Sequence, residues 1–458
     1  IVGSGYYYGY YLLDSRPYYH GASVLVYDIS SKSHPNLIQN VTAEGYYVDS
    51  RLIGDHVYLA VTHYLWYWYN DDEIHLPVIT NNGVTRQIKP WDIYYWADPA
   101  SSYTLTSIIS INVEDSTLNQ KIYLTDAGHE MYVSEDYVYL AKQHYVVSVS
   151  GSGSRWFPNT VIHKIAINEG RISYVASGIV PGRILNQFSM DEHKGYFRIA
   201  TTTGGWWRDE SKNNVYVMNK DMETVGKLEG LAPGETIYSA RFFGNRCYLV
   251  TFKKIDPFFV IDLRNPESPK VLGKLKIPGF STYLHPYDEN HVIGIGKNAD
   301  DQGDFAWFQG LKMSLFDVTN VYRPKEIAKI DIGDRGTQSE ALYDHKAFLF
   351  DKSRDLLIIP IQLHEVDESK YSGEIPPNAY GEFVTQGAFV FKLTIEDGFE
   401  LKGTISHMDE NWENPYTYWR GPFVRRSLYI EDNIYTVSNG MVKINDMDTL
   451  AEIKTVDL

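Results

Sequence analysis

The sequence predicts an all-β protein on three observations that agree: composition, local periodicity and turn residues. Of its 458 residues, 43% are hydrophobic and 14% are aromatic, with 37 Tyr and 10 Trp, a balance typical of strand-rich proteins. Short alternating stretches of apolar and polar residues run throughout, separated by Gly, Asp, Asn and Pro. Helical periodicity is almost absent, so we expect strands joined by turns along the whole chain.

The first recurring element is a short alternating strand that ends at Asp or Asn and continues into a turn, as in "SVLVYDIS" and "PFFVIDLRNPESP". Its eight copies begin at Ser23, Ser107, Thr160, Asn213, Pro257, Leu311, Ala388 and Met441. A single pattern that returns so often predicts a repeat architecture.

The second recurring element is a polar turn followed by a strongly apolar strand, as in "SRLIGDHVYLAV", "ARFFGNRCYLVTF" and "LYIEDNIYTVS". Seven copies alternate with the first element at a period of roughly 40 to 55 residues, which is typical of four-stranded antiparallel blades in a β-propeller. We therefore predict a single β-propeller domain over residues 1–458.

The count of the two elements suggests how the propeller closes. The strand at Met441 has no second element after it, whereas "IVGSG" at the start resembles a second element without a first. Because an unclosed ring exposes strand edges, we expect eight blades with one completed by both termini, or seven if the ends do not pair. The abrupt start within an apparent strand predicts that an upstream segment is missing.

Three stretches interrupt the period, at residues 63–103, 364–386 and 407–421, and are rich in Tyr, Trp, Pro and Asn. Long insertions in repeat proteins often emerge on one rim and carry binding residues. An aromatic loop that covers a blade edge is an equally good interpretation.

The longest motif, "GLKMSLFDVTNVYRPKEI…IGDRGTQSEALYDHKAFLF…LLIIPI" in residues 310–360, together with "EGYYVDSRLIGDHVYLAV" and "IYYWADPASSYTLTSIISIN", resembles the family of secreted β-propeller domain proteins distantly related to WD40 repeats, found in archaea and some bacteria. The resemblance covers nearly the whole chain. It implies a propeller and an extracellular or cell-surface location, but no reaction and no catalytic residues. At the N-terminus the chain departs from the family, because the expected earlier strands and export signal are absent.

Charge and cysteine content exclude several classes of partner. A formal charge of −16 and a pI near 5.3 argue against nucleic acid and anionic lipid, which need a basic surface. A negative net charge is compatible with divalent cations as partners. The single cysteine, Cys247, cannot form an internal disulfide. No apolar stretch is long enough to span a bilayer, so no transmembrane segment is expected.

The loop "GIGKNADDQGDFAWFQG" is the best candidate for a metal site. Its carboxylates and amide offer several hard oxygen ligands that suit Ca²⁺. The candidate ligands are Asn298, Asp300, Asp301 and Asp304. The alternation of ligands and the closing Glu of an EF-hand are missing, so an ordinary acidic loop is the alternative.

The polar turns before the apolar strands are predicted to be structural. An Asp or Asn in such a turn bonds its own backbone and tolerates a left-handed conformation. The predicted turn residues are Asp55, Asp136, Asn245, Asp344, His345 and Asp432. A metal or catalytic role for His345 is the alternative.

The runs "HYLWYWYN" and "PWDIYYWAD" present flat aromatic faces that can stack on sugar rings or pack against a blade. The candidate binding residues are Trp66, Trp68, Trp91, Tyr94, Tyr95 and Trp96. The tripeptide "NVT" at Asn40 is an N-glycosylation acceptor motif, which would fit an external location.

No hydrolase motif of the Gly-x-Ser-x-Gly or His-Glu-x-x-His type occurs, and no catalytic residue is assigned. The sequence favours a non-catalytic extracellular propeller that acts as a cell-surface structural or assembly protein, in a filament or surface layer, or as a binding module. Its partners would be copies of itself, other surface proteins or glycans, with Ca²⁺ as the only cofactor considered. The alternative is a carbohydrate-active or other hydrolase with carboxylates at the channel mouth.

Overall fold

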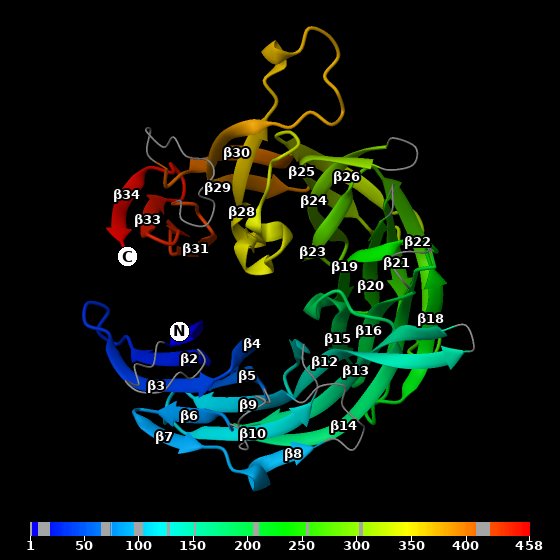
Figure 1. Ribbon diagram of the computed structural model, residues 1–458. Coiled ribbons are helices and arrows are strands. Elements are labelled where there is room, and N and C mark those ends of the chain that lie inside the picture. Colours follow the sequence, from blue (N-terminus) through cyan, green and yellow to red (C-terminus); the bar gives the residue numbers. More distant parts are fainter. Residues whose placement is uncertain are drawn as a thin grey trace. The chain divides into compact units, whose positions relative to one another are not determined.

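Most sheets of the fold are made from one stretch of sequence that runs up and down in antiparallel strands (Figure 1). The computed structural model describes residues 2–7, 19–65, 74, 76–95, 104–125, 129–150, 153–204, 210–252, 256–301, 306–408 and 422–458. These residues form eight sheets, named A to H in chain order. The all-β prediction and the prediction of eight blades are confirmed.

Sheets C to H have four strands each, paired in chain order. Sheet C contains β11 (His129–Val133), β12 (Tyr137–Ser150), β13 (Gly153–Asn168) and β14 (Arg171–Pro181); sheet D contains β15 (Met190–His193), β16 (Tyr196–Thr203), β17 (Lys212–Met218) and β18 (Thr224–Leu231). Sheet E contains β19 (Thr236–Phe243), β20 (Arg246–Phe252), β21 (Asp256–Asp262) and β22 (Lys270–Ile277); sheet F contains β23 (Phe280–Asp288), β24 (His291–Asp301), β25 (Ala306–Asp317) and β26 (Lys325–Ile332). Sheet G contains β27 (Leu349–Asp351), β28 (Leu356–Glu365), β29 (Glu382–Thr394) and β30 (Gly398–Ile405); sheet H contains β31 (Arg426–Ile430), β32 (Asn433–Val437), β33 (Met441–Asp446) and β34 (Glu452–Asp457).

Sheets A and B have five strands instead of the expected four, because the first predicted insertion adds strands to their edges. Sheet A contains β1 (Val2–Tyr7), β2 (Tyr19–Asp28), β3 (Asn36–Glu44), β6 (Val78–Asn81) and β7 (Val84–Gln87) in that order; sheet B contains β4 (Tyr46–Ile53), β5 (His56–Tyr64), β9 (Thr104–Asn112), β10 (Leu118–Thr125) and β8 (Ile93–Tyr95). Strand β8 pairs with β10 in parallel. Part of this insertion is therefore sheet rather than loop.

The ends of the chain differ from the sequence prediction. Among the described strands, β1 pairs with β2 and β34 pairs with β33, and no sheet combines strands from both termini. Sheet H needs no strand from the N-terminus because β31 to β34 already supply four. The predicted blade completed by both termini is not seen in the described part of the chain.

Both recurring sequence elements occupy fixed places in the sheets. Seven copies of the first element are the third strands of their sheets, namely β9, β13, β17, β21, β25, β29 and β33, and the copy at Ser23 is β2, the second described strand of sheet A. The terminal Asp or Asn explains the turn that follows. For example, Asp28, Asp262 and Asp317 each accept a hydrogen bond from the backbone N–H two residues later, at 2.9, 3.0 and 2.8 Å. Such a side chain replaces the backbone acceptor that the end of the ladder lacks.

The chain divides into two compact units, which are described separately. The first unit comprises residues 1–199 and 216–225, and the second comprises residues 200–215 and 226–458. In the first unit, Tyr139 of sheet C stacks on Phe197 of sheet D at 4.5 Å between ring centroids. In the second unit, Phe258 of sheet E stacks on Phe316 of sheet F at 4.7 Å. Buried aromatic pairs thus join neighbouring sheets in both units.

Glycines in fourth strands let the next sheet approach closely in the second unit. A Cβ atom on Gly226 of β18 would lie 1.9 Å from the carbonyl oxygen of Pro266, and one on Gly273 of β22 would lie 2.3 Å from that of Val321. Both carbonyls belong to the turn after a third strand of the following sheet. Any side chain at these positions would push the two sheets apart.

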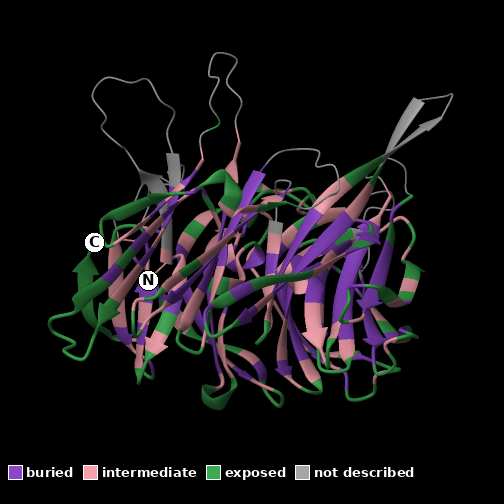
Figure 2. Ribbon diagram, turned by 90° about the horizontal axis from the view of Figure 1, so that it is seen from below, coloured by how far each residue is buried: buried purple, intermediate pink, exposed green. Residues whose placement is uncertain are grey.

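The described residues contain no helix long and apolar enough to cross a membrane. Their helices are single 3-10 turns: η1 (Pro90–Asp92), η2 (Gln187–Ser189), η3 (Glu340–Leu342), η4 (His345–Ala347), η5 (Lys352–Arg354) and η6 (Glu368–Lys370). Figure 2 shows buried residues mainly along the strands and exposed residues mainly at the turns that join them.

Candidate functional site

A cleft of the first unit lies at the turns between first and second strands of sheets B, C and D. Its volume is about 570 Å³, which falls in the range of small-ligand sites. It is lined by Arg51, Leu52, Ile53, Tyr132, Val133, Ser134, Glu135, Asp136, Glu192 and Lys194. The cleft therefore combines charged groups with apolar walls.

Arg51 is a wall of this cleft rather than a free cation. Its Nη1 lies 2.8 Å from Oδ2 of Asp49 and donates to the carbonyl oxygen of Ser50, also at 2.8 Å. Its Nη2 donates to Oε1 of Gln187 at 2.6 Å. Because these partners occupy N–H donors on the edge of the guanidinium and Asp49 balances its charge, Arg51 is held in place and is poorly placed to bind a ligand anion.

The acidic groups of the cleft are less constrained. Glu135 and Asp136 are exposed, and their side chains make no ion pair within the part of the chain that the structure describes. Glu192 accepts a hydrogen bond from Oγ of Ser134 at 2.6 Å. The lining also includes Lys194, at a turn position with φ of 53°, and the charge of Lys164 acts on Glu192 from outside the lining. Because Arg51 is already paired with Asp49, negative charge predominates among the side chains that line the cleft.

Two apolar features complete the cleft. Leu52 is 64% exposed, and the ring of Tyr132 forms part of the wall. Burial, followed by the nearby charge of Asp191, raises the pKa of Tyr132 to about 12, so its hydroxyl stays neutral at ordinary pH. A cation with an aliphatic stem matches this lining, since the stem packs on the apolar wall while the charge meets the carboxylates.

A pair of carboxyl groups lies on the first strands behind the cleft. Asp49 on β4 is buried, and Glu130 on β11 is half-buried. Burial is the main reason that the pKa of Glu130 is raised, and the charge of Asp49 adds to it. Since Asp49 is paired with Arg51, the two carboxyls have different surroundings, which is how acid and base roles are separated in enzymes.

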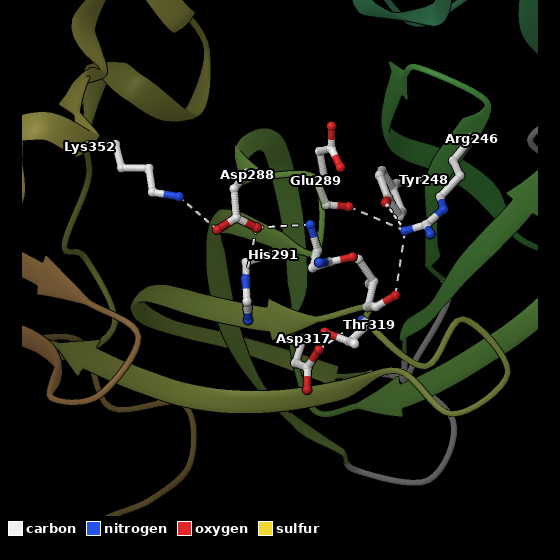
Figure 3. A network of polar contacts seen from close by, with 10 residues as sticks. Arg246, Tyr248, Asp288, Glu289, His291, Asp317, Thr319 and Lys352 are labelled. Atoms are coloured by element: carbon white, nitrogen blue, oxygen red, sulfur yellow. Dashed lines mark hydrogen bonds and ion pairs between the residues drawn. The ribbon is translucent and has the colours of Figure 1, made fainter.

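In the second unit, ion pairs and hydrogen bonds link the corresponding turns of neighbouring sheets. Figure 3 shows Asp288, at the end of β23, between His291 and Lys352. Its Oδ1 lies 2.8 Å from Nδ1 of His291, and its Oδ2 accepts from Nζ of Lys352 at 2.8 Å. Burial alone would raise the pKa of Asp288, but Lys352, the Asn290 backbone and His291 together lower it to about 2.

Further bridges of the second unit involve neighbouring sheets. Arg246 of sheet E donates to the carbonyl oxygens of Glu289 and Val318 in and beside sheet F, at 3.3 and 3.5 Å (Figure 3). Between sheets G and H, Arg354 pairs with Asp432 at 3.0 Å. The charged turns of this unit are thus used to hold sheets together.

The predicted turn residues take two different places. Asp55, Asp136, Asn245 and Asp432 lie between first and second strands, as predicted. Asp344 and His345 do not: Asp344 caps η4 ahead of β27, accepting from the N–H of Lys346 at 2.9 Å. The hairpin of sheet G is made instead at η5, where Asp355 adopts a φ of 50°. Asp344 also binds Arg426 of sheet H.

The predicted aromatic site is only partly described. Trp91 is 81% exposed and Tyr95 77% exposed, at η1 and the outer strand β8. The hydroxyl of Tyr94 accepts from Nζ of Lys121 at 2.8 Å, so this ring packs on its own sheet. Trp66, Trp68 and Trp96 lie outside the described residues. Of the described candidate residues, Trp91 and Tyr95 therefore have rings exposed enough to contact a ligand.

The predicted calcium loop belongs to the hairpin of β24 and β25. Asn298 bonds the N–H of Ala299 at 3.0 Å, and Asp300 accepts from Gln309 at 2.7 Å. Asp301 ends β24 opposite Ala306, and Asp304 lies outside the described residues. The residues that are described contain no group of three His, Cys, Asp or Glu arranged to hold a metal. A Ca²⁺ site here stays a prediction.

Asn40, the predicted glycosylation acceptor, lies on β3 with an exposed side chain. Its backbone N–H donates to the side chain of Asn82 at 2.8 Å.

Sequence reasoning missed Arg51, Glu130, Glu192 and Lys194. One signal was available: the turns "SED" at Ser134 and "DEHK" at Asp191 carry acids where the equivalent turn of sheet E carries Gly244 and Asn245.

Comparisons with known proteins agree on the fold and leave the activity open. The chain matches the family described as "Beta propeller domain" over residues 2–450. It is 31% identical to an uncharacterized protein of Methanocaldococcus jannaschii over 94% of this chain and 72% of that protein. It is 43% identical to an uncharacterized protein of Archaeoglobus fulgidus over 43% of this chain and 30% of that protein. A mutant apocarotenoid oxygenase of Synechocystis matches at a TM-score of 0.32 and 9% identity, over 56% of this chain and 58% of that one, a likeness too low to support an argument.

Proposed function

Because the chain belongs to the β-propeller domain family, we propose that it is a non-catalytic binding domain at the cell surface whose first-unit cleft takes a lysine- or arginine-bearing segment of a partner protein. The observation that carries this proposal is the lining of the cleft: Glu135, Asp136 and Glu192 around an apolar wall that includes Leu52. The partner is a second copy of the chain or another surface protein. The external location rests on the family resemblance.

The charged turns of the second unit are consistent with a structural role rather than a second binding site. In the second unit, most carboxylates at the turns already have cationic or backbone donors, as Asp288 and Asp432 do. Groups engaged in this way stabilise the domain and are poorly placed to transfer protons. In the cleft of the first unit, by contrast, two exposed acids without an ion pair among the described residues lie beside an apolar wall.

The proposal is tested by titrating the purified chain with a short oligolysine peptide in a calorimeter, at low and at physiological salt. We expect the double variant Glu135→Gln/Asp136→Asn to weaken binding by about tenfold, or 1.4 kcal/mol. The matched control is Glu114→Gln/Glu169→Gln, which removes two exposed turn charges elsewhere in the first unit. Equal weakening by both double variants would contradict a specific cleft and indicate attraction to the net charge alone.

Assembly with other copies is tested on the same protein. Light scattering and electron microscopy, with and without a calcium chelator, would reveal polymers and their dependence on Ca²⁺. Polymers that dissociate on chelation would support both a self-assembly role and a Ca²⁺ site near Asp300. A monomer that is indifferent to chelation would contradict both.

A hydrolase is the second candidate, and the Asp49 and Glu130 pair favours it. A carboxyl with a raised pKa beside a second carboxyl that is paired with an arginine resembles the two-carboxyl arrangement of glycoside hydrolases. If the chain hydrolyses a panel of glycosides, Glu130→Gln should reduce turnover at least about 100-fold, whereas the nearby Glu135→Gln should not. No turnover on the panel by the native chain would leave binding as the better proposal.

A further inference from the structure

A second, much smaller cavity lies in the second unit, between sheet G and the segment that precedes β31. Its volume is about 20 Å³, which is room for one water molecule. It is lined by Gln338, Ser339, Glu340, Pro360, Gln362, Gln386, Phe423, Val424 and Arg425. Six of its nine lining residues have polar side chains, so it differs from the voids lined only by apolar groups, which stay dry.

Three glutamines form a row across this cavity. Gln338 and Gln362 exchange backbone hydrogen bonds of 3.0 and 2.8 Å, and Gln362 lies opposite Gln386 in the ladder of β28 and β29. The amide of Gln386 is used at both ends by Val424: its Nε2 donates to the carbonyl and its Oε1 accepts from the N–H, each at 2.8 Å. Gln386 therefore ties sheet G directly to this segment.

The orientation of the Gln362 amide follows from His364. Nδ1 of His364 lies 3.1 Å from the carbonyl oxygen of Gly381, which can only accept, so Nδ1 carries the hydrogen. In the neutral ring Nε2 is then an acceptor, and it lies 2.9 Å from Nε2 of Gln362. The Gln362 amide must donate from its nitrogen to satisfy this contact.

This assignment directs Oε1 of Gln362 away from His364. The atom is buried and has no hydrogen-bond donor among the described residues. A buried amide oxygen without a donor costs roughly 1–3 kcal/mol. Since Gln362 lines the cavity, a donor placed there would remove this cost.

We infer that the cavity binds a single ordered water that donates one hydrogen to Oε1 of Gln362 and links sheet G to the segment before β31. Glu340 and Arg425, 4.0 Å apart in the same lining, supply an acceptor and donors for its other hydrogen bonds. A metal ion fits less well, because the carbonyls of Pro360 and Val424 already accept from Ser339 and Gln386. Too few free oxygens remain for a cation that needs six or more.

The test is a high-resolution crystal structure of the whole chain, with crystals grown once in sodium and once in rubidium salts. We expect one density peak at about 2.7–3.0 Å from Oε1 of Gln362 and no anomalous signal in rubidium. An anomalous peak there would replace the water by a monovalent cation, and the absence of density would overturn the site.

Two variants separate the water from simple packing. Gln362→Leu should abolish the peak and lower the melting temperature by about 2–4 °C. Gln362→Glu keeps an acceptor toward the cavity and should retain the peak; its second carboxylate oxygen then faces Nε2 of His364, which can donate to it once the ring takes up a proton at that nitrogen. A peak that survives in Gln362→Leu, or disappears in Gln362→Glu, would contradict the assignment to Oε1. If Gln362→Leu fails to fold, the native and Gln362→Glu crystals still decide the question.

Discussion

The turns between first and second strands are charged in both units, but the two units use them differently. In the second unit, Asp288 and Asp432 take Lys352 and Arg354 from the neighbouring sheet. In the first unit, Glu135 and Asp136 stay exposed around a cleft of about 570 Å³. The same position in the repeat therefore serves cohesion in one unit and leaves charge available for a ligand in the other. Binding groups can evolve at such turns because the sheets below are held by their own cores.

The largest expected effect tests whether those cores are equivalent. Phe316→Ala and Phe197→Ala each remove one ring of a fully buried stacked pair, one in each unit. Each should lower the free energy of unfolding by about 3–5 kcal/mol, measured by urea denaturation, because each leaves a cavity. Tyr322→Ala, at a ring 66% exposed, is the control and should change little. A large difference between the two core variants would mean that the units are not held alike.

A smaller effect tests the bridges of the second unit. Asp288→Asn should lower stability at pH 7 by about 1 kcal/mol after allowance for solvent screening, with Glu289→Gln in the same turn as the control. The pKa of Asp288 is lowered to about 2, so the stabilisation is complete above the ordinary pKa near 3.8 and is lost as the pH falls toward 2. Thermal melts of the native chain and the variant should converge over that range. A constant difference would contradict the ionic origin.

For Glu130 in the first unit, we expect stability to change with pH in the opposite direction. Its pKa is raised by burial and by Asp49, so its ionised form destabilises the fold, and stability is lost as the pH rises through the folded pKa. Glu130→Gln should therefore stabilise the chain at neutral pH, in the same melts, whereas Glu135→Gln should be neutral. A loss of stability in Glu130→Gln would show that neighbouring groups stabilise the ionised Glu130 carboxylate. The two units would then not differ in how they treat a charged carboxylate.

The smallest effect concerns the outer edge of sheet B. Trp91→Ala and Tyr95→Ala should each change stability by less than about 0.5 kcal/mol, because both rings are mainly exposed. If these rings bind sugars, glycan-array signals should fall in both variants while the melting temperature stays constant. A marked loss of stability would instead assign the rings to packing.

The repeat of the sequence predicted most of the fold because the strands and turns depend on local residues. Several of the repeated strands end at a residue such as Asp28 or Asp317, whose side chain builds the next turn. Strands β6, β7 and β8 were not foreseen, since an insertion carries no repeat that would reveal where it pairs. The turn at Asp344 was misplaced because "LYDHKAFLF" contains the polar turn and the apolar strand in the expected order, although η4 intervenes.

The candidate cleft was beyond sequence reasoning for a different reason. Glu135 and Asp136 lie in a predicted turn, but their role depends on Arg51 and Glu192 from other sheets, which lie far away in the sequence. Likewise, the pKa of Glu130 on sheet C depends on Asp49, which lies on sheet B and much earlier in the sequence. A single sequence places residues within a blade and does not show which turns of different blades face one another.

The strands added to sheets A and B have a consequence for the order of folding. Sheets C to H each close from one uninterrupted stretch, so each can form soon after its last strand leaves the ribosome. Sheet A cannot, because β6 and β7 lie in sequence between β5 and β9 of sheet B. Sheet A is therefore completed only after β4 and β5 of sheet B have emerged, and β8 must wait for its partner β10 before sheet B is complete. A nascent chain that stops before residue 118 would leave β8 and β9 of sheet B without β10, although the described strands of sheet A would all be present.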